Sequence, residues 1–181
     1  KRLESLSLKL LDLIVMNNQS FSMSPAHTVP LFEEISGAVY PALAQSEIVL
    51  ELHIVPQLIL VEKDLFKTLI INLIDKARKA SPPGSRIEIF GGEKEGQYEI
   101  CVQDHGIGIP KEDLQRITEA FYMVDKSRSR KQHGAGLGLA ICERIAQLHQ
   151  TVLRFESAPG EGTRVFLSLV PVAKEEKNEE V

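Results

Sequence analysis

One amide and two ammonium groups recur at regular spacing in the stretch NLIDKARK, residues 72–79. Asn72 and Lys76 are four residues apart and Lys79 follows three residues later, so a helix would place all three on one face. The other side of that helix is apolar. A polar stripe of this kind suits the oxygens of a polyphosphate. The alternative is a solvated helix face on which Asp75 and Lys79 form an ordinary ion pair.

A second candidate site is the glycine-rich stretch DHGIGI, residues 104–109, directly after a strand-like run. Asp104 offers a hydrogen-bond acceptor there. Gly106 and Gly108 permit a close approach of the backbone to a ligand, and Ile107 and Ile109 add apolar surface. The alternative interpretation is a turn that simply ends the strand.

A third stretch, GAGLGL at residues 134–139, runs into an amphipathic helix. Its glycines, Gly134, Gly136 and Gly138, can hinge a loop and let backbone N–H groups face a phosphate at the helix N-terminus, where the helix dipole favours an anion. The preceding stretch, 123–133, is polar and basic without apolar periodicity, which predicts a mobile loop. Three of its cations, Lys126, Arg128 and Arg130, are candidates for ligand binding, and a solvated basic loop is the alternative.

The elements that must position these residues follow from hydrophobic periodicity. Helices are expected from about residue 30, within 61–81, at 110–117 and at 137–149, and a strand at 47–55. Two hairpins are expected, one over 86–104 turning at 91–96 and one over 151–170 turning at 159–162. The pattern predicts an α+β two-layer sandwich, with a mixed, mostly antiparallel sheet and about three helices on one face.

The chain divides into four predicted regions. Leucines recur at 3-4-3 spacing over residues 1–16, which indicates the seam of a coiled coil or of a helical hairpin, although a core helix of the same domain fits as well. Residues 17–28 are expected to form a linker, residues 29–172 the main domain and residues 173–181 a disordered tail.

Composition narrows the possible partners. The 181 residues carry a net charge of −4, which argues against nucleic acid as a partner. No apolar run reaches the length of a membrane span, so no membrane contact is expected of this piece, although a longer parent protein could be anchored in the inner membrane. Cys101 and Cys142 lack metal-ligand spacing and are expected to be buried free thiols in a reducing, cytoplasmic compartment.

Taken together in order, four stretches resemble the boxes of a known superfamily. Residues 72–79, 104–109, 119–130 and 134–139, closed by GEGT at 160–163, resemble the N, G1, F and G2 boxes of the GHKL superfamily. Within it, the chain is most similar to the catalytic and ATP-binding domain of bacterial sensor histidine kinases. The resemblance covers residues 29–171 and implies a Bergerat-type sandwich with a mobile lid. By the same resemblance, residues 1–16 look like the C-terminal end of a dimerisation helical hairpin.

The resemblance implies ATP as the ligand and assigns roles to single residues. Asp104 would accept a hydrogen bond from the exocyclic amine of adenine, and Thr163 would hold the base through its hydroxyl group or a water molecule. Asn72 would bind Mg²⁺ and, with Lys79, serve catalysis, while Phe121 would pack beneath the lid. The implied nucleotide-binding set is Asn72, Lys76, Lys79, Asp104, Gly106, Ile107, Gly108, Ile109, Tyr122, Lys126, Arg128, Arg130, Gly134, Gly136, Leu137, Gly138, Leu139 and Thr163.

The position of Lys76 departs from the family pattern. Four residues after the first asparagine, the N box normally carries a second asparagine that binds Mg²⁺. An ammonium group has no lone pair and cannot bind a metal ion while charged, but it can replace part of the cation's charge beside the phosphates. Because Mg²⁺ neutralises developing charge in phosphoryl transfer, catalysis should suffer more than binding.

Asn72 bears on the choice among superfamily members. Related hydrolases place a glutamate in the N-box helix as a general base, and an asparagine cannot take a proton at neutral pH. The pattern therefore favours a protein-histidine kinase that transfers the γ-phosphate of ATP to a histidine on a separate dimerisation domain, with a response regulator downstream and a homodimeric parent. The alternatives are a nucleotide-binding pseudokinase or interaction module, and then a hydrolase.

Overall fold

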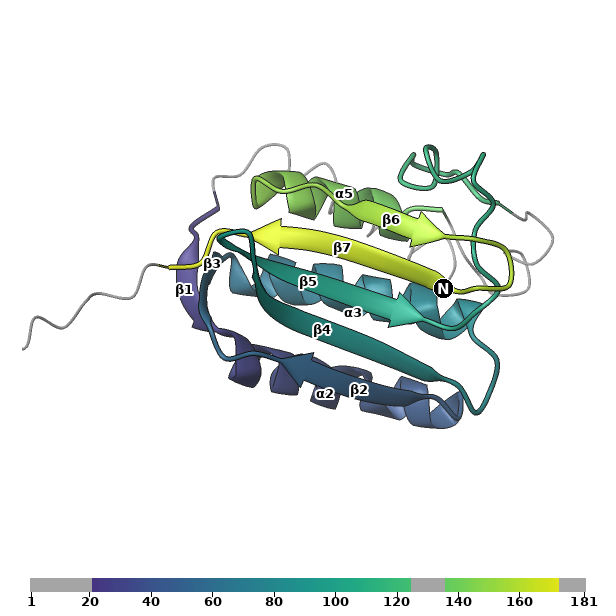
Figure 1. Cartoon of the computed structure of the whole chain (residues 1–181), viewed down its shortest axis with the longest axis horizontal. Coiled ribbons are helices and arrows are strands. Elements are labelled where there is room, and N and C mark those ends of the chain that lie inside the picture. Colours follow the sequence, from purple (N-terminus) through teal and green to yellow (C-terminus); the bar gives the residue numbers. More distant parts are fainter. Residues whose placement is uncertain (1–20, 125–135, 173–181) are drawn as a thin grey trace, which may run out of the picture.

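A five-stranded sheet forms one layer of the molecule and helices cover one of its faces (Figure 1). The computed structural model describes residues 21–124 and 136–172. The strand order is β2-β4-β5-β7-β6; β2 runs parallel to β4, and every other neighbouring pair is antiparallel. These strands span Val49–Ile54 (β2), Arg86–Lys94 (β4), Gln97–Asp104 (β5), Thr163–Leu169 (β7) and Arg154–Ser157 (β6).

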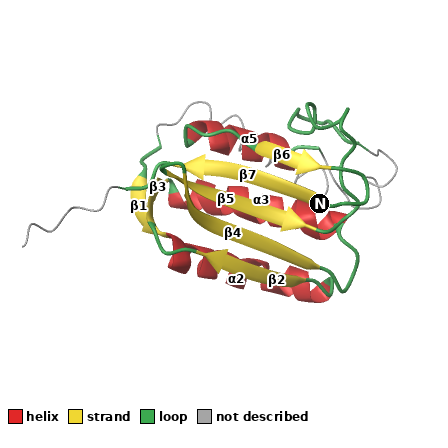
Figure 2. Cartoon of the chain, in the orientation of Figure 1, coloured by secondary structure: helices red, strands yellow, loops and turns green. Residues whose placement is uncertain are grey.

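Three helices within the described residues form the second layer: α2 (Thr28–Gln45), α3 (Lys63–Ala80) and α5 (Gly138–Leu148). Figure 2 shows all three behind the same face of the sheet. The predicted α+β two-layer sandwich with a mixed, mostly antiparallel sheet is confirmed. None of the helices in this part of the chain combines the length and apolar character that a membrane span needs.

Helix α3 lies at the centre of the helical layer, because its apolar side chains recur at the spacing of one helix face. Six of them are buried: Phe66, Leu69, Ile70, Leu73, Ile74 and Ala77. The Glu62 carboxylate caps the first turn by accepting a hydrogen bond from the Leu65 N–H at 2.6 Å. Helix α3 packs against both α5 and β5, so its polar side borders the end of the sheet.

The turn of the first hairpin is shorter than predicted. Gly91 and Gly92 continue β4, and the strands are joined by Glu95 and Gly96 alone, both with positive φ, as a tight two-residue hairpin turn requires. Gly91 serves packing instead. A Cβ atom there would lie 2.6 Å from the Tyr98 hydroxyl oxygen, and this hydroxyl donates a hydrogen bond to the Val55 carbonyl at 2.7 Å.

The helix predicted at 110–117 is absent, and the segment forms successive turns. Its hydrogen bonds connect mainly residues three apart, such as Asp113 N–H to the Pro110 carbonyl at 3.0 Å and Arg116 N–H to the Asp113 carbonyl at 2.9 Å. So short a segment gains too few helical hydrogen bonds to offset the cost of starting a helix.

Part of the predicted linker 17–28 is a strand. β1 (Ser24–His27) pairs antiparallel with β3 (Leu58–Val61) in a separate two-stranded sheet, and neither strand was predicted, because each depends on a partner far away in sequence. Helix α2 begins at Thr28, whose buried hydroxyl donates to the Val55 carbonyl at 3.1 Å and accepts from the Gln57 N–H at 3.0 Å. The hairpin predicted at 1–16 and the tail predicted at 173–181 lie outside the described residues.

Candidate functional site

A cavity of about 230 Å³ lies between α3, the carboxyl end of β5, the segment 107–124 and the start of α5. Apolar walls come from the helices and from the helix-facing side of the sheet. Ten residues of the predicted set line the cavity: Lys76, Lys79, Asp104, Ile107, Gly108, Ile109, Tyr122, Gly136, Leu139 and Thr163. Gly106, Leu137, Gly138 and Asn72 belong to neighbouring positions of the same elements. Lys126, Arg128, Arg130 and Gly134 lie outside the described residues.

Asp104 is a buried carboxylate at one end of the cavity, with only 6% of its surface exposed. Burial raises the pKa of Asp104, while hydrogen bonds from the backbone of Gly106 and of Thr163 oppose the rise. The Gly106 N–H donates to Asp104 Oδ1 at 2.8 Å, so the side chain is held in place. A buried acceptor held in this way matches a ligand that brings its own donor, because an unpaired buried polar group is unfavourable.

Ser157 is a site residue that the sequence analysis missed. Its hydroxyl donates to the Gly162 carbonyl at 2.7 Å and accepts from the Ile109 N–H at 2.8 Å. Since that single proton goes to Gly162, the contact at 3.0 Å between Ser157 Oγ and Thr163 Oγ1 must be donated by Thr163. The lone pairs of Thr163 are thereby left as acceptors for the cavity.

The Ser157 contacts join two loops that are far apart in sequence, the stretch 104–109 and the turn 158–162. A Cβ atom on Gly108, which has φ of 69°, would lie 1.8 Å from the Ala158 carbonyl oxygen. Gly108 is expected to permit close approach of a ligand; it lines the cavity and also permits close approach of the protein's own backbone. No signal in the sequence of either loop alone reveals this contact.

The other end of the cavity lies where α3 meets the start of α5. A Cβ atom on Gly138 would stand 3.2 Å from Lys76 Cε and 3.5 Å from Asn72 Oδ1, so this glycine lets both side chains reach the helix start. The amide nitrogen of Asn72 donates to the Thr68 carbonyl at 2.8 Å. Helix α5 has no side-chain cap at its N-terminus and no acidic residue in its first turn, which leaves its N–H groups suited to an anion.

Lys79 fits both interpretations of the polar face of α3, as a wall of a binding site and as the partner of Asp75 in an ion pair. It lines the cavity and also pairs with Asp75 at 2.5 Å, while Arg78 pairs with the same carboxylate at 2.7 Å. Burial raises the pKa of Asp75, but the hydrogen bonds from Lys79 and Arg78 outweigh it and hold that pKa below its usual value. Asp75 is thus an ionised anchor for Lys79.

Tyr122 closes the side of the cavity formed by the segment 107–124. Its hydroxyl hydrogen-bonds the Asp113 carboxylate, and the Arg116 guanidinium lies over its ring, 4.3 Å from the centroid. The Gly136 carbonyl accepts from the Phe121 N–H at 3.0 Å, which ties the two ends of the segment 121–136 together. Phe121 itself is 53% exposed and has a positive φ of 67°, and most of the lid beneath which it was expected to pack lies outside the described residues.

The apolar wall of the cavity could be predicted from the sequence only in part. Val102 and Val165 face the helices from β5 and β7, and Leu73 and Ala77 face the sheet from α3. Alternation in the two hairpins could have shown which strand residues face the helices, but not which of them border a cavity. Cys101 and Cys142 are buried thiols outside any disulfide, as predicted.

Comparisons with known proteins agree with this geometry. The family of histidine kinase-, DNA gyrase B- and HSP90-like ATPases matches residues 61–174. The sensor-like histidine kinase SenX3 of Mycolicibacterium smegmatis is 42% identical over 111 residues, covering 61% of this chain and 29% of that protein. The sensor histidine kinase WalK of Bacillus subtilis is 37% identical over 121 residues, covering 66% of this chain and 20% of that protein.

Solved structures share the fold. The mycobacterial sensor histidine kinase MprB superimposes with a TM-score of 0.73 at 24% identity, covering 84% of this chain and 99% of that one. A full-length ShkA structure, in complex with AMPPNP, gives a TM-score of 0.81 at 20% identity over 95% of this chain and 37% of that one.

The chain therefore belongs to the family of histidine kinase-, DNA gyrase B- and HSP90-like ATPases. Within this family it corresponds to the ATP-binding catalytic domain of two-component sensor histidine kinases. It spans 29% of the length of SenX3 and 20% of the length of WalK.

Proposed function

We propose that the cavity binds the adenine nucleotide from Asp104 at one end to the start of α5 at the other, and that the parent protein transfers the γ-phosphate to a histidine on a separate domain. The observation that carries this proposal is the placement of a buried acceptor, Asp104, and two cations, Lys76 and Lys79, around a single cavity. Adenine offers a hydrogen-bond donor to Asp104, and the phosphates offer negative charge to Lys76 and Lys79.

In this arrangement each end has a separate task. Asp104 and Thr163 present acceptors to the base, and Ile107 and Ile109 cover its faces. The uncapped N–H groups of α5 and the Lys76 ammonium group meet the phosphates, where positive charge stabilises both bound nucleotide and developing charge. Lys79, anchored on Asp75, adds a second cation on the same side.

The described residues at the phosphate end fit Mg²⁺ poorly. This ion prefers near-octahedral oxygen ligands, and of the N-box pair only Asn72 offers a carbonyl oxygen, while Lys76 brings a positive charge to the neighbouring position. We therefore assign no step to Mg²⁺. Lys76 supports binding of the phosphates without a metal ion and leaves phosphotransfer weak, which makes a nucleotide-binding pseudokinase the second candidate function.

Calorimetric titration of ATP, with Mg²⁺ and with a chelator, tests the role of Lys76. The chain should bind ATP equally in both conditions, whereas the Lys76→Asn variant should bind more tightly with Mg²⁺. Adenosine is the matched control, since it lacks phosphates and should bind both proteins alike. Equal responses of both proteins to Mg²⁺ would contradict the proposed replacement, and failure of both to bind any nucleotide would leave only an interaction module.

Phosphotransfer needs its own assay, because the acceptor histidine is expected on another domain. The chain would be supplied with a separately produced dimerisation domain of its parent and radiolabelled ATP. Labelling of the acceptor that increases at least tenfold in Lys76→Asn supports an impaired kinase. Strong Mg²⁺-dependent labelling by the unchanged chain would show that Lys76 does not impair catalysis.

A further inference from the structure

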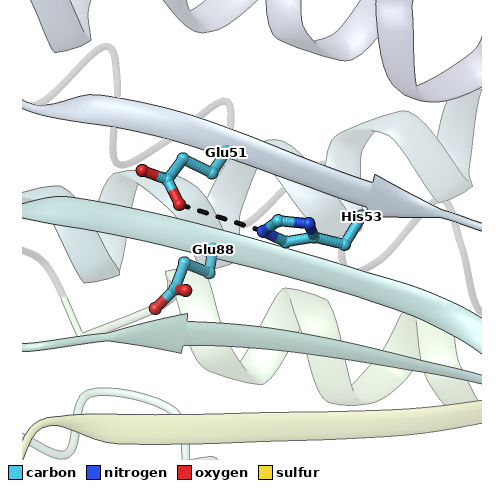
Figure 3. A group of neighbouring side chains, drawn as sticks. All are labelled: Glu51, His53 and Glu88. Atoms are coloured by element: carbon cyan, nitrogen blue, oxygen red, sulfur yellow. Dashed lines mark ion pairs between the residues drawn. The ribbon is translucent and has the colours of Figure 1, made fainter.

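The open face of the sheet, opposite to the helices, carries a cluster of possible metal ligands. Glu51 and His53 belong to β2 and Glu88 to the adjacent β4, where Glu51 is the register partner of Glu88 (Figure 3). One oxygen of each carboxylate and one ring nitrogen of His53 lie within 4.8 Å of one another. Because Glu51 and His53 are two residues apart on a strand, both side chains leave the same face.

The imidazole of His53 is already oriented toward this cluster. Its ring stacks on the Phe90 ring, with 4.9 Å between centroids and 14° between planes. Its Nε2 atom points toward Glu51 Oε2 at 3.8 Å, as Figure 3 shows. Stacking restricts rotation of the ring, so a ligand atom here loses little freedom when it binds an ion.

Glu88 is the most buried member of the cluster, with only 12% of its side chain exposed. Its Oε2 atom lies 2.7 Å from His105 Nε2 and 3.3 Å from Arg86 Nε. Both contacts fall on Oε2, so Oε1 can bind an ion without breaking them. Such outer partners orient a metal-binding carboxylate.

We propose that Glu51, His53 and Glu88 form a binding site for Zn²⁺. One imidazole nitrogen and two carboxylate oxygens form a ligand set that Zn²⁺ accepts, with water in the fourth position. Ligand atoms about 2.0 Å from a tetrahedral ion lie roughly 3.3 Å apart. Since the ligand atoms now lie within 4.8 Å of one another, they have to close by up to about 1.5 Å. Rotation of the half-exposed Glu51 side chain, together with small adjustments of the other two, provides this closure. Mg²⁺ prefers six oxygen ligands and binds weakly here.

The site is independent of the proposed nucleotide site, since the cavity is lined by the helix-facing side of the same sheet. The nearby strand β5 carries Cys101, which is the register partner of Phe90, the residue that stacks on His53. Burial raises the pKa of the Cys101 thiol to about 11, so it stays protonated at neutral pH and is a poor competing ligand. A bound ion links the edge strand β2 to its neighbour and should stabilise the folded chain.

Titration of the whole chain with Zn²⁺ alone, in the absence of nucleotide and near neutral pH, tests the site. We expect one equivalent of Zn²⁺ to bind and to raise Tm by a few degrees, with no comparable effect of Mg²⁺. His53→Asn and Glu51→Gln should each weaken Zn²⁺ binding at least about tenfold, the loss that even an outer partner can cause. Arg86→Gln should strengthen it, because a positive charge beside Glu88 is removed.

His27→Asn is the matched control, since His27 is exposed on β1 and outside the cluster; it should leave Zn²⁺ binding unchanged. Far-UV circular dichroism checks that each variant is folded, and Glu51→Gln keeps the test valid if His53→Asn fails. Absence of Zn²⁺ binding, or binding that both cluster variants leave unchanged, would overturn the proposal. None of these outcomes depends on whether the cavity binds a nucleotide.

Discussion

The two ends of the cavity are built in different ways. At the end of Asp104, two loops are fixed to each other by hydrogen bonds of Ser157 and by glycine-to-backbone packing. At the end of α5, two long side chains of α3 reach an uncapped helix start. The first end carries the residue types that the family resemblance implies there, while the second carries Lys76 where the family pattern has a metal ligand.

This difference separates recognition from chemistry. In the proposed function the base end discriminates among ligands. Asp104 is a buried acceptor held in a fixed direction by the Gly106 N–H, and a ligand without a matching donor would leave its remaining lone pairs unpaired. The phosphate end supplies positive charge, which attracts any polyphosphate without selecting its base. If the proposed function holds, a lysine in place of a metal ligand at the second end should leave nucleotide selection intact and weaken phosphotransfer.

The largest effect is expected from Gly108→Ala. The added Cβ atom would stand 1.8 Å from the Ala158 carbonyl oxygen, so the two loops must separate, at a cost of about 3 kcal/mol in unfolding free energy. Gly160→Ala is the matched control, because its φ is similarly positive at 81° but nothing lies within 4 Å; it should cost only about 1 kcal/mol. Chemical denaturation measures both, and equal losses would show that the loop contact is unimportant.

Asp104→Asn should weaken binding of adenosine and of ATP by a similar factor, about thirtyfold or roughly 2 kcal/mol, as expected for a hydrogen bond to a charged acceptor. Lys76→Asn, in contrast, should leave adenosine binding unchanged. Isothermal calorimetry of the two ligands with the two variants separates the ends. If Asp104→Asn weakened the binding of ATP but not of adenosine, the assignment of the base to the Asp104 end would be wrong.

The pH dependence of adenosine binding should begin at a higher pH than for an ordinary aspartate, because burial raises the pKa of Asp104. As the pH falls through this raised pKa, the carboxylate takes up a proton and loses acceptor capacity, so affinity should decrease on acidification. The sign is opposite for folding: the folded chain holds this proton more tightly, so the Asp104 contribution to stability falls as pH rises. Asp104→Asn should remove the Asp104 part of both dependences.

The smallest effect on stability is expected at the C-terminal end of α5, away from the proposed phosphate site. Gln150 has φ of 57° in the position after the helix cap, and the Thr151 N–H bonds the Ala146 carbonyl at 3.0 Å, as in a Schellman motif. Gln150→Gly should raise the unfolding free energy by roughly 0.5 kcal/mol, since relief of left-handed strain slightly exceeds the added entropy of the unfolded chain. Nucleotide affinity should not change; a change would mean that the two ends of α5 are coupled.

Much of the fold could be predicted from periodicity alone. Helix α3 and the strand pairs β4–β5 and β6–β7 were predicted because local spacing decides which residues meet the core. β1 and β3 could not be predicted, since neither is a strand without the other. The prediction of a helix at 110–117 was wrong, because so short a segment forms too few helical hydrogen bonds to offset the cost of starting a helix.

The amino-acid sequence by itself determined which residue types are present at each box, including the lysine at position 76, and their order indicated the class of domain. Only the tertiary structure decided that Gly108 faces Ala158, that Ser157 directs the proton of Thr163 and that Glu51, His53 and Glu88 meet across two strands. The physical reason is that these contacts join segments up to about fifty residues apart, and such pairings depend on packing and register, which no local pattern encodes.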